Sequence, residues 1–181
     1  MARTKINSRQ VLFDDEFDIK QLSSDPSNPS AGNKRLFAKN DDQIYALNSG
    51  GGKTLLSTNE FCIPFIIDGG GALITTGVQG GLYITFPYLI VEYTIASIDP
   101  LTTSGSIVVD IWTDTHANFP PTVADSITAS AKPTISSGVK AQTTSLTGWT
   151  TTQTAGRWIY YNVDSVSGFT KICLTLKCIR I

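Results

Sequence analysis

The sequence is poor in histidine, the side chain on which most acid–base catalysis near neutral pH depends. It contains one histidine, His116, among 181 residues. Such catalysis otherwise needs a tuned pair of carboxylates. A single histidine also excludes a metal site built from several histidines of one chain. We therefore predict that the protein is not an enzyme.

Charge and long apolar runs are also scarce. Charged residues make up 16% of the chain, and the formal net charge is -1. A chain without an excess of basic residues lacks the surface that binds nucleic acid. No apolar run reaches the roughly 18 residues of a membrane-spanning helix. The polar opening, MARTKINSRQ, lacks the apolar segment of a secretory signal. We therefore expect neither nucleic-acid binding nor membrane insertion.

The three cysteines give no sign of a disulfide framework. Cys173 and Cys178 lie five positions apart in a segment with strand character, so their side chains should point to opposite faces. Cys62 is distant from both in sequence, and the chain has no CxxC motif. This pattern predicts buried, reduced thiols in a protein assembled in a reducing cytosol.

The charges that are present concentrate in the first third of the chain. Residues 1–60 hold 8 basic and 8 acidic residues, whereas residues 61–181 hold 6 and 7. The later part is rich in threonine, serine and β-branched residues. We predict an attachment arm and linker over 1–33, a β-hairpin module over 34–58 and a β-sandwich domain over 59–181.

An apolar stripe marks the predicted arm. It lies in QVLFDDEFDIKQL, residues 10–22, which is either a short helix or an extended arm that docks on another subunit. The acidic residues between the apolar ones fit a docking patch or a solvated face better than a catalytic pair. The predicted attachment residues are Val11, Leu12, Phe13, Phe17 and Ile19, and the acidic residues are Asp14, Asp15, Glu16 and Asp18.

A β-hairpin is predicted from Arg35 to Leu47, with a turn at residues 40–42. One hairpin of this size is not stable alone, so it must pack on the rest of the chain or on further copies. Gly52-Lys53-Thr54 resembles the end of a phosphate-binding loop, but that motif needs a glycine at position 47, where this chain has leucine. We interpret the segment as a turn.

The remainder of the chain has β character throughout. Gly, Pro, Asp and Ser separate short stretches of alternating apolar and polar residues, and no helical segment lies between them. In the last stretch, Ile172, Leu174, Leu176 and Cys178 share one face. The pattern predicts an all-β, antiparallel β-sandwich or jelly-roll-like body. The expected strands are 62–67, 72–76, 82–86, 89–96, 106–112, 140–145, 158–163 and 170–179.

Two clusters in this body could bind a ligand. Asp110, Asp114 and His116 would share a face of one strand and could hold a metal, although a solvated strand end is the stronger interpretation. Sugar rings could stack on exposed aromatic side chains, although most tryptophans of small sandwiches lie in the core or at interfaces. The candidates are Trp112, Trp149 and Trp158, with Tyr83, Tyr88, Tyr93, Tyr160 and Tyr161. Trp149, in a loop, and Trp112 are the possible glycan contacts.

Parts of the chain resemble tailed-bacteriophage virion structural proteins. Residues 25–47, DPSNPSAGNKRLFAKNDDQIYAL, are similar to a short module of phage fibre proteins. The opening MARTKINSRQV, residues 105–136, residues 146–151 and the closing segment from Asn162 to Ile181 resemble phage virion proteins with all-β domains. The resemblance implies a homotrimer without a cofactor or catalysis. The chain differs from long fibres in its shortness and in having no coiled-coil heptads or repeated shaft.

Two functions follow as expectations. The first is a trimeric capsid decoration (cement) protein or short head fibre on the virion surface, which binds other virion proteins such as the major capsid protein. The second is a short tail fibre or receptor-binding protein that contacts tail or baseplate proteins and recognises host surface glycans. In either case the trimer interface is expected at Leu36, Phe37, Ile44, Tyr45 and Leu47.

Overall fold

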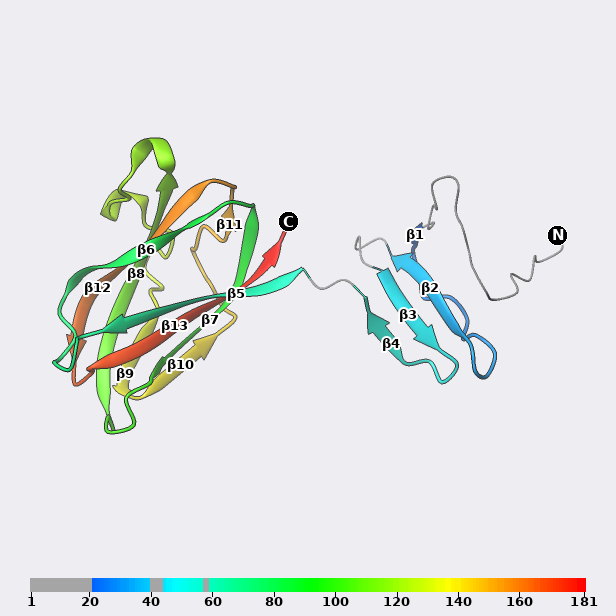
Figure 1. Cartoon of the computed structure of the whole chain (residues 1–181), viewed down its shortest axis with the longest axis horizontal. Helices are drawn as coiled ribbons and strands as arrows, with labels where there is room; N and C mark the ends of the chain where they lie inside the picture. Colours follow the sequence, from blue (N-terminus) through cyan, green and yellow to red (C-terminus); the bar gives the residue numbers. More distant parts are fainter. Residues whose placement is uncertain (1–20, 40–43, 57–58) are drawn as a thin grey trace. The chain divides into compact units, whose positions relative to one another are not determined.

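A computed structural model describes residues 21–39, 44–56 and 59–181 of the chain. The chain divides into two compact units, residues 1–58 and 59–181 (Figure 1). Both units consist of β-sheet in their described parts, which confirms the all-β prediction. The predicted attachment residues from Val11 to Ile19 and the acidic residues among them lie outside the described residues.

The first unit contains a small four-stranded sheet. Its strand order is β1-β2-β3-β4, and β1 runs parallel to β2 whereas the other neighbours are antiparallel. The predicted hairpin is confirmed, because Phe37 lies opposite Tyr45 and Arg35 opposite Leu47. The strands are β1 (Gln21–Leu22), β2 (Lys34–Lys39), β3 (Ile44–Asn48) and β4 (Lys53–Leu55).

Side-chain contacts fix the connections of this sheet. Oδ1 of Asn48 accepts hydrogen bonds from the backbone N–H groups of Gly50 and Gly52, at 3.0 and 2.8 Å, and so forms the turn before β4. Nζ of Lys53 lies 2.5 Å from the carboxylate of Asp25. The lysine of the glycine-rich segment is therefore paired within the chain, and the interpretation of that segment as a turn is confirmed.

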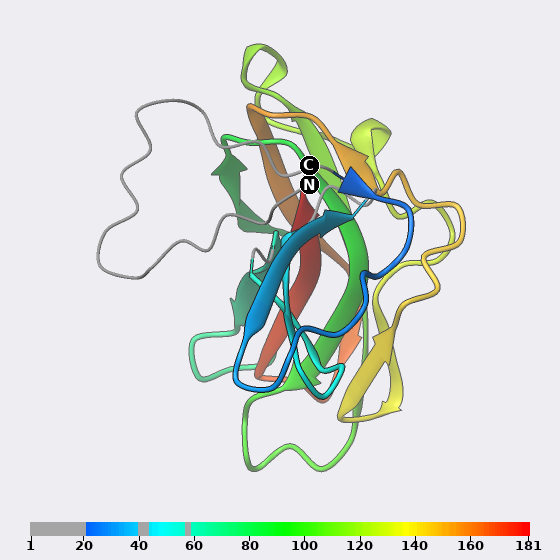
Figure 2. The same cartoon turned by 90° about the vertical axis from the view of Figure 1, so that its right-hand side faces the viewer.

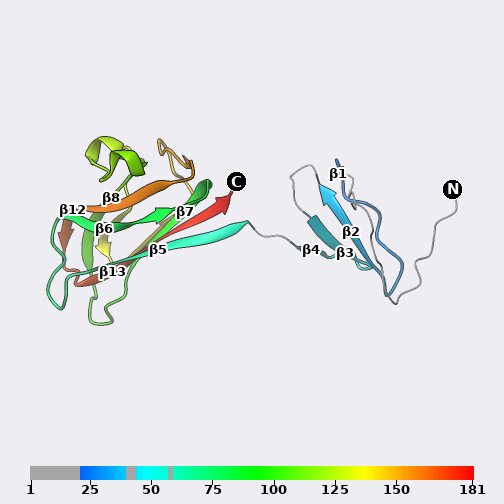
Figure 3. The same ribbon diagram turned by 45° about the horizontal axis from the view of Figure 1, so that its top comes forward.

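The second unit is a sandwich of two antiparallel sheets. In one layer the order is β10-β7-β13-β5, with β11 also pairing with β7, and in the other it is β6-β12-β8-β9. Figure 3 shows β6, β8 and β12 in one layer and β5 and β13 in the other. The first sheet comprises β5 (Glu60–Asp68), β7 (Tyr88–Ser97), β10 (Lys140–Thr143), β11 (Thr152–Gln153) and β13 (Lys171–Arg180). The second comprises β6 (Gly77–Ile84), β8 (Gly105–Thr115), β9 (Thr134–Gly138) and β12 (Arg157–Ser167).

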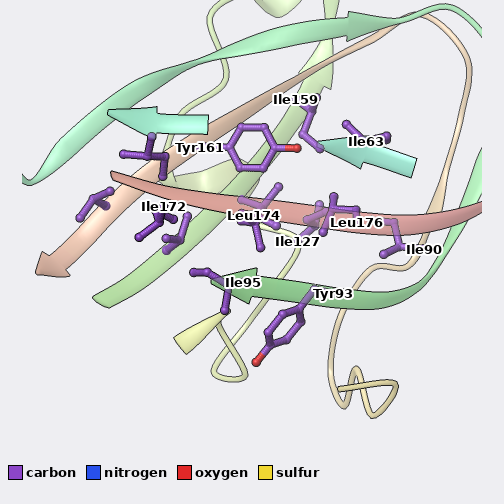
Figure 4. Close-up of a cluster of buried hydrophobic side chains, with 14 of the residues drawn as sticks. Ile63, Ile90, Tyr93, Ile95, Ile127, Ile159, Tyr161, Ile172, Leu174 and Leu176 are labelled. Carbon is purple, nitrogen blue, oxygen red and sulfur yellow. The ribbon is translucent and has the colours of Figure 1, made fainter. Parts of the chain in front are cut away.

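Apolar side chains fill the space between the two sheets (Figure 4). Strand β13 lies between β7 and β5, and its alternate residues Ile172, Leu174, Leu176 and Cys178 are fully buried. From the other sheet, the ring of Tyr161 stacks on Phe65 with a centroid distance of 4.2 Å. The alternation in the sequence therefore predicts correctly which face of the last strand lies in the core.

The strand predictions hold for the long apolar segments and fail around glycines. Residues 72–76, expected as a strand, lie in the connection before β6, where Oδ1 of Asp68 accepts the N–H of Gly70 and starts a turn. Strand β6 contains Gly77, Gly80 and Gly81, which lowered its β character in the sequence. A Cβ atom on Gly81 would lie 2.2 Å from the carbonyl oxygen of Ile159, so close strand packing requires glycine there.

All three cysteines are free, as predicted, but they are not all buried. Cys62 is exposed on the edge strand β5, and Cys173 is partly buried. Cys178 is buried, and the loss of solvent around it raises the pKa of its thiol to about 12. The expectation of buried thiols is therefore wrong for Cys62, because its position alternates with the core residue Ile63.

The connection between β8 and β9 includes two short 3-10 turns, η1 (His116–Asn118) and η2 (Val123–Asp125). Both turns lie toward the same end of the sandwich (Figures 1 and 2). Ile127 in this connection is in the core, and its backbone N–H donates to the carbonyl of Ile111 in β8 at 2.9 Å. The connection thus packs along β8.

No helix in the described part of the chain is long and apolar enough to cross a membrane.

Candidate interaction surface

The two tryptophans predicted to contact glycans are buried. Trp149 is 8% exposed, stacks on Tyr93 with a centroid distance of 5.8 Å, and donates its indole N–H to the carbonyl of Ala131 at 2.8 Å. Trp112 is 9% exposed and lies beside Ser126 of the β8–β9 connection. The expectation that these rings contact a sugar is therefore wrong, because the chain's own loops cover them.

A buried charge holds that connection in place. Asp110 in β8 is 1% exposed, and its Oδ1 accepts hydrogen bonds from the hydroxyl groups of Ser126 and Thr128, both at 2.6 Å. Nζ of Lys132 lies 3.0 Å from Oδ2 of Asp110 and 2.6 Å from the carboxylate of Asp164 in β12. Residues 126–132 are thus fixed against two neighbouring strands.

The same contacts keep Asp110 ionised. Burial by itself would raise the pKa of its carboxyl group, but the hydroxyl donors Ser126 and Thr128 and the ammonium group of Lys132 outweigh that effect and lower the pKa below its ordinary value. Asp110 therefore serves as a structural acceptor. Within the described ranges, no group of three or more His, Cys, Asp and Glu side chains is arranged to hold a metal ion.

The exposed aromatic side chains gather around Trp158 instead. In the β6-β12-β8 order, Trp158 lies opposite Tyr83 on one side and opposite Asp114 on the other. The ring centroid of Trp158 is 5.4 Å from that of Tyr83 and 4.8 Å from that of Phe119. We use the name Trp158 cluster for Tyr83, His116, Phe119, Trp158 and Tyr160.

The cluster is open to solvent. Tyr83 is 42% and Phe119 46% exposed, His116 is exposed, and Trp158 and Tyr160 are partly buried. Gly81 lies opposite Tyr160, and a Cβ atom there would lie 2.2 Å from the Tyr160 ring. The absence of a side chain at Gly81 therefore lets the Tyr160 ring lie close to the sheet.

A hydrogen bond joins the rings of His116 and Trp158. The indole N–H of Trp158 donates to Nδ1 of His116 at 3.1 Å, and the two ring planes differ by 27°. An indole N–H and the lone pair of an imidazole nitrogen both lie in the planes of their rings, so this hydrogen bond places the rings side by side. Accepting at Nδ1 leaves Nε2 of His116 to carry the proton and to act as a donor.

Polar groups border the cluster. Oδ1 of Asp114 accepts the amide group of Asn118 at 3.3 Å and lies 3.9 Å from the guanidinium of Arg157. The exposed amide of Asn118 and the Nε2–H of His116 are both in η1, next to the aromatic rings.

Sequence reasoning named Tyr83, Trp158 and Tyr160 among the aromatic candidates but did not predict that they lie together, although one signal was present. In β12 the core residues Ile159, Tyr161 and Val163 alternate with Trp158 and Tyr160. Strand periodicity therefore places both rings on the outer face. The contributions of Phe119 and His116 depend on the path of the β8–β9 connection, which no local pattern specifies.

The residues predicted for a trimer interface divide into two groups. Phe37 and Leu47 are 3% and 2% exposed in a single chain, so the expectation that neighbouring copies bury them is wrong for these two. Leu36 and Ile44 are 56% and 38% exposed. They share a face of the small sheet with Ala38 and Ala46, because Leu36 lies opposite Ala46 and Ala38 opposite Ile44. Tyr45 stacks on Phe37 across the strands.

Comparisons with known proteins give little further information. No family model matches the chain, and no curated protein sequence matches it. Among solved structures, the chain is similar to one described as the capsid of Ralstonia phage GP4, with 13% sequence identity and a TM-score of 0.38 over 67% of this chain and 84% of that chain. At this score the likeness carries no argument about function.

Proposed function

We propose that the protein is a non-enzymatic structural protein of a tailed-bacteriophage virion, and that it is a trimeric capsid decoration protein or short head fibre. The sequence resemblance of residues 25–47 and of the β body to phage virion proteins motivates this proposal. The observation that carries it is the division into a sandwich and a separate small sheet, because that sheet exposes apolar side chains that further copies can cover.

The small sheet supports association of copies. Leu36, Ile44 and Leu56 are 56%, 38% and 53% exposed, although the unit to which they belong is small. Burying one large apolar side chain contributes about 1.5–3 kcal/mol. Repeated in each copy, this burial favours a closed, symmetric oligomer over a single chain.

The N-terminal segment supplies the proposed attachment to the virion. Its apolar residues from Val11 to Ile19 would dock on the capsid lattice, and the sandwich would project outward on the virion surface. Several weak attachments acting together in a trimer produce lasting binding, because each further contact becomes intramolecular. The protein would bind itself and the major capsid protein, and it would need no cofactor.

The alternative is a short tail fibre or receptor-binding protein that attaches to tail or baseplate proteins and recognises host glycans. The exposed Trp158 cluster favours this second function, since a decoration protein needs no aromatic surface facing solvent. Both functions place the chain on the virion after assembly in the bacterial cytoplasm. They differ in the position on the particle.

Arm substitutions in the full chain test the attachment. Phe13→Asp combined with Phe17→Asp should remove the protein from purified particles, as measured by mass spectrometry, while the free protein keeps its circular dichroism spectrum. Asn7→Asp combined with Ser8→Asp adds the same charge to the polar part of the segment and should leave incorporation unchanged. Normal incorporation of the first variant would overturn the role of the arm.

A further inference from the structure

We propose that the Trp158 cluster is a binding site for an uncharged saccharide. The site lies on the outer face of β6 and β12 and at the turn η1, away from the two tryptophans that the sequence suggested. The proposal extends the alternative function, that of a receptor-binding protein. It rests on that function only for the identity of the ligand as a host glycan. Binding by the purified chain is measurable whether the protein sits on a capsid or on a tail.

The shape of the surface fits the apolar face of a sugar ring. His116 and Trp158 lie side by side with ring planes 27° apart, and together they offer an area wider than one indole. Tyr83 and Phe119 are tilted against Trp158 by 48° and 53° and so add inclined ring faces beside it. A pyranose presents C–H groups on one face, which pack on aromatic rings as apolar groups do.

Hydrogen-bonding groups stand where the hydroxyl groups of a sugar would project. Nε2 of His116 is a donor because Nδ1 accepts the indole N–H of Trp158. The amide of Asn118 is exposed two residues further along η1, and its carbonyl oxygen is an acceptor. A few polar groups beside aromatic walls are typical of small-molecule sites.

The charged residues beside the rings favour a neutral sugar over an acidic one. Asp114 is a charged residue beside the rings, since it lies directly opposite Trp158, and it is partly exposed. Arg157 is 3.9 Å from that carboxylate and compensates it. The two charges therefore offset each other, and Arg157 is not free to attract an acidic sugar.

A protein partner is the competing occupant, and the geometry disfavours it. The inclined rings and the donor and acceptor groups of η1 suit a ligand that alternates apolar faces with hydroxyl groups. A protein interface of standard size buries about 800 Å² on each side. Such an interface would have to extend well beyond these five rings.

Binding of neutral oligosaccharides to the full chain tests the proposal. The probes are maltohexaose, cellohexaose and mannohexaose, with hexagalacturonate as the acidic counterpart, and the readouts are isothermal titration calorimetry and quenching of the accessible indole. We expect at least one neutral probe to bind and hexagalacturonate to bind more weakly. Failure of all neutral probes, or a preference for hexagalacturonate, would overturn the proposal.

Variants assign the binding to the cluster. Tyr83→Ser and Phe119→Ser alter side chains more than 40% exposed, so neither should unfold the sandwich, and each should weaken binding about tenfold. Leu101→Ser removes an apolar side chain that is 87% exposed elsewhere and should leave binding unchanged. Undiminished binding by both cluster variants would contradict the proposal. Protection of Tyr83 and Phe119 between copies in hydroxyl-radical footprinting would contradict it as well.

Discussion

The ammonium nitrogen of Lys132 lies 3.0 Å from Oδ2 of Asp110, a carboxylate that is 1% exposed. The same nitrogen lies 2.6 Å from the carboxylate of Asp164. One lysine therefore joins the β8–β9 connection to two neighbouring strands. The ion pairs hold the later part of this connection, whereas His116 and Phe119 of the Trp158 cluster lie at its beginning.

Lys132→Met should lower the free energy of unfolding by about 2 kcal/mol, because it leaves the buried Asp110 carboxylate without its cation. Denaturant unfolding followed by circular dichroism measures the effect. Lys177→Met is the matched control, since Lys177 pairs with Glu60 on the surface and exposed ion pairs contribute little. Equal stability of the two variants would contradict the structural role of Lys132.

Acid should weaken the fold through Asp110. The pKa of this carboxyl group is lower in the folded protein than its ordinary value of 3.8. At a pH between the folded pKa and 3.8, the unfolded chain therefore binds a proton more readily than the folded chain does. The resulting stabilisation is fully present above pH 4 and is lost as the pH falls through the folded pKa. Unfolding free energies between pH 2 and about 6 should therefore decline less steeply on acidification in Asp110→Asn than in the unmodified protein. Identical slopes would show that Asp110 has no such linkage.

Gly81→Ala should destabilise the sandwich by about 1–3 kcal/mol, because the added Cβ would lie 2.2 Å from both the carbonyl oxygen of Ile159 and the Tyr160 ring. Gly138→Ala is the control, since its nearest atom would be 3.7 Å away. Thermal unfolding distinguishes the two variants. A Gly81→Ala protein as stable as Gly138→Ala would contradict the close approach of β6 and β12.

Thiol labelling should separate the three cysteines. Cys62 is exposed and should react rapidly with a maleimide in the folded protein, whereas Cys178 is buried with a raised pKa and should react only after unfolding. Cys62→Ser should abolish the rapid phase, and Cys178→Ser should leave it unchanged. A rapid phase of unchanged amplitude in Cys62→Ser would contradict the assignment of that phase to Cys62.

Much of the fold was predictable because alternation of apolar and polar residues marks a strand with one buried face. Ile172, Leu174 and Leu176 show this pattern, and so does the hairpin around Phe37 and Tyr45. Strand β6 was placed poorly because its glycines are required by contacts with β12, which are distant in sequence.

The site was less predictable than the fold. Trp149 follows turn residues and therefore looked exposed, yet its ring stacks on Tyr93, a partner more than 50 positions away in the sequence. His116 and Phe119 reach Trp158 because they follow the end of β8, where Asp114 lies opposite Trp158 in the neighbouring strand β12. Such long-range contacts decide which aromatic rings face solvent, and local periodicity does not contain them.

The oligomeric state should depend on the small sheet. Leu36→Asp combined with Ile44→Asp places charges on its exposed apolar face and should convert a trimer into single chains of 19.5 kDa in native mass spectrometry. Leu73→Asp combined with Leu101→Asp, which changes two exposed leucines of the sandwich, should leave the trimer intact. Dissociation by the second pair alone would place the interface on the sandwich.

Electron microscopy of antibody-labelled phage particles tests the proposed function most directly. We predict label distributed over the exterior of the capsid, at positions related by three-fold symmetry, and its loss in the Phe13→Asp, Phe17→Asp variant. Label confined to the tail would contradict the capsid role in favour of the receptor-binding alternative. Particles that carry none of the protein would contradict both.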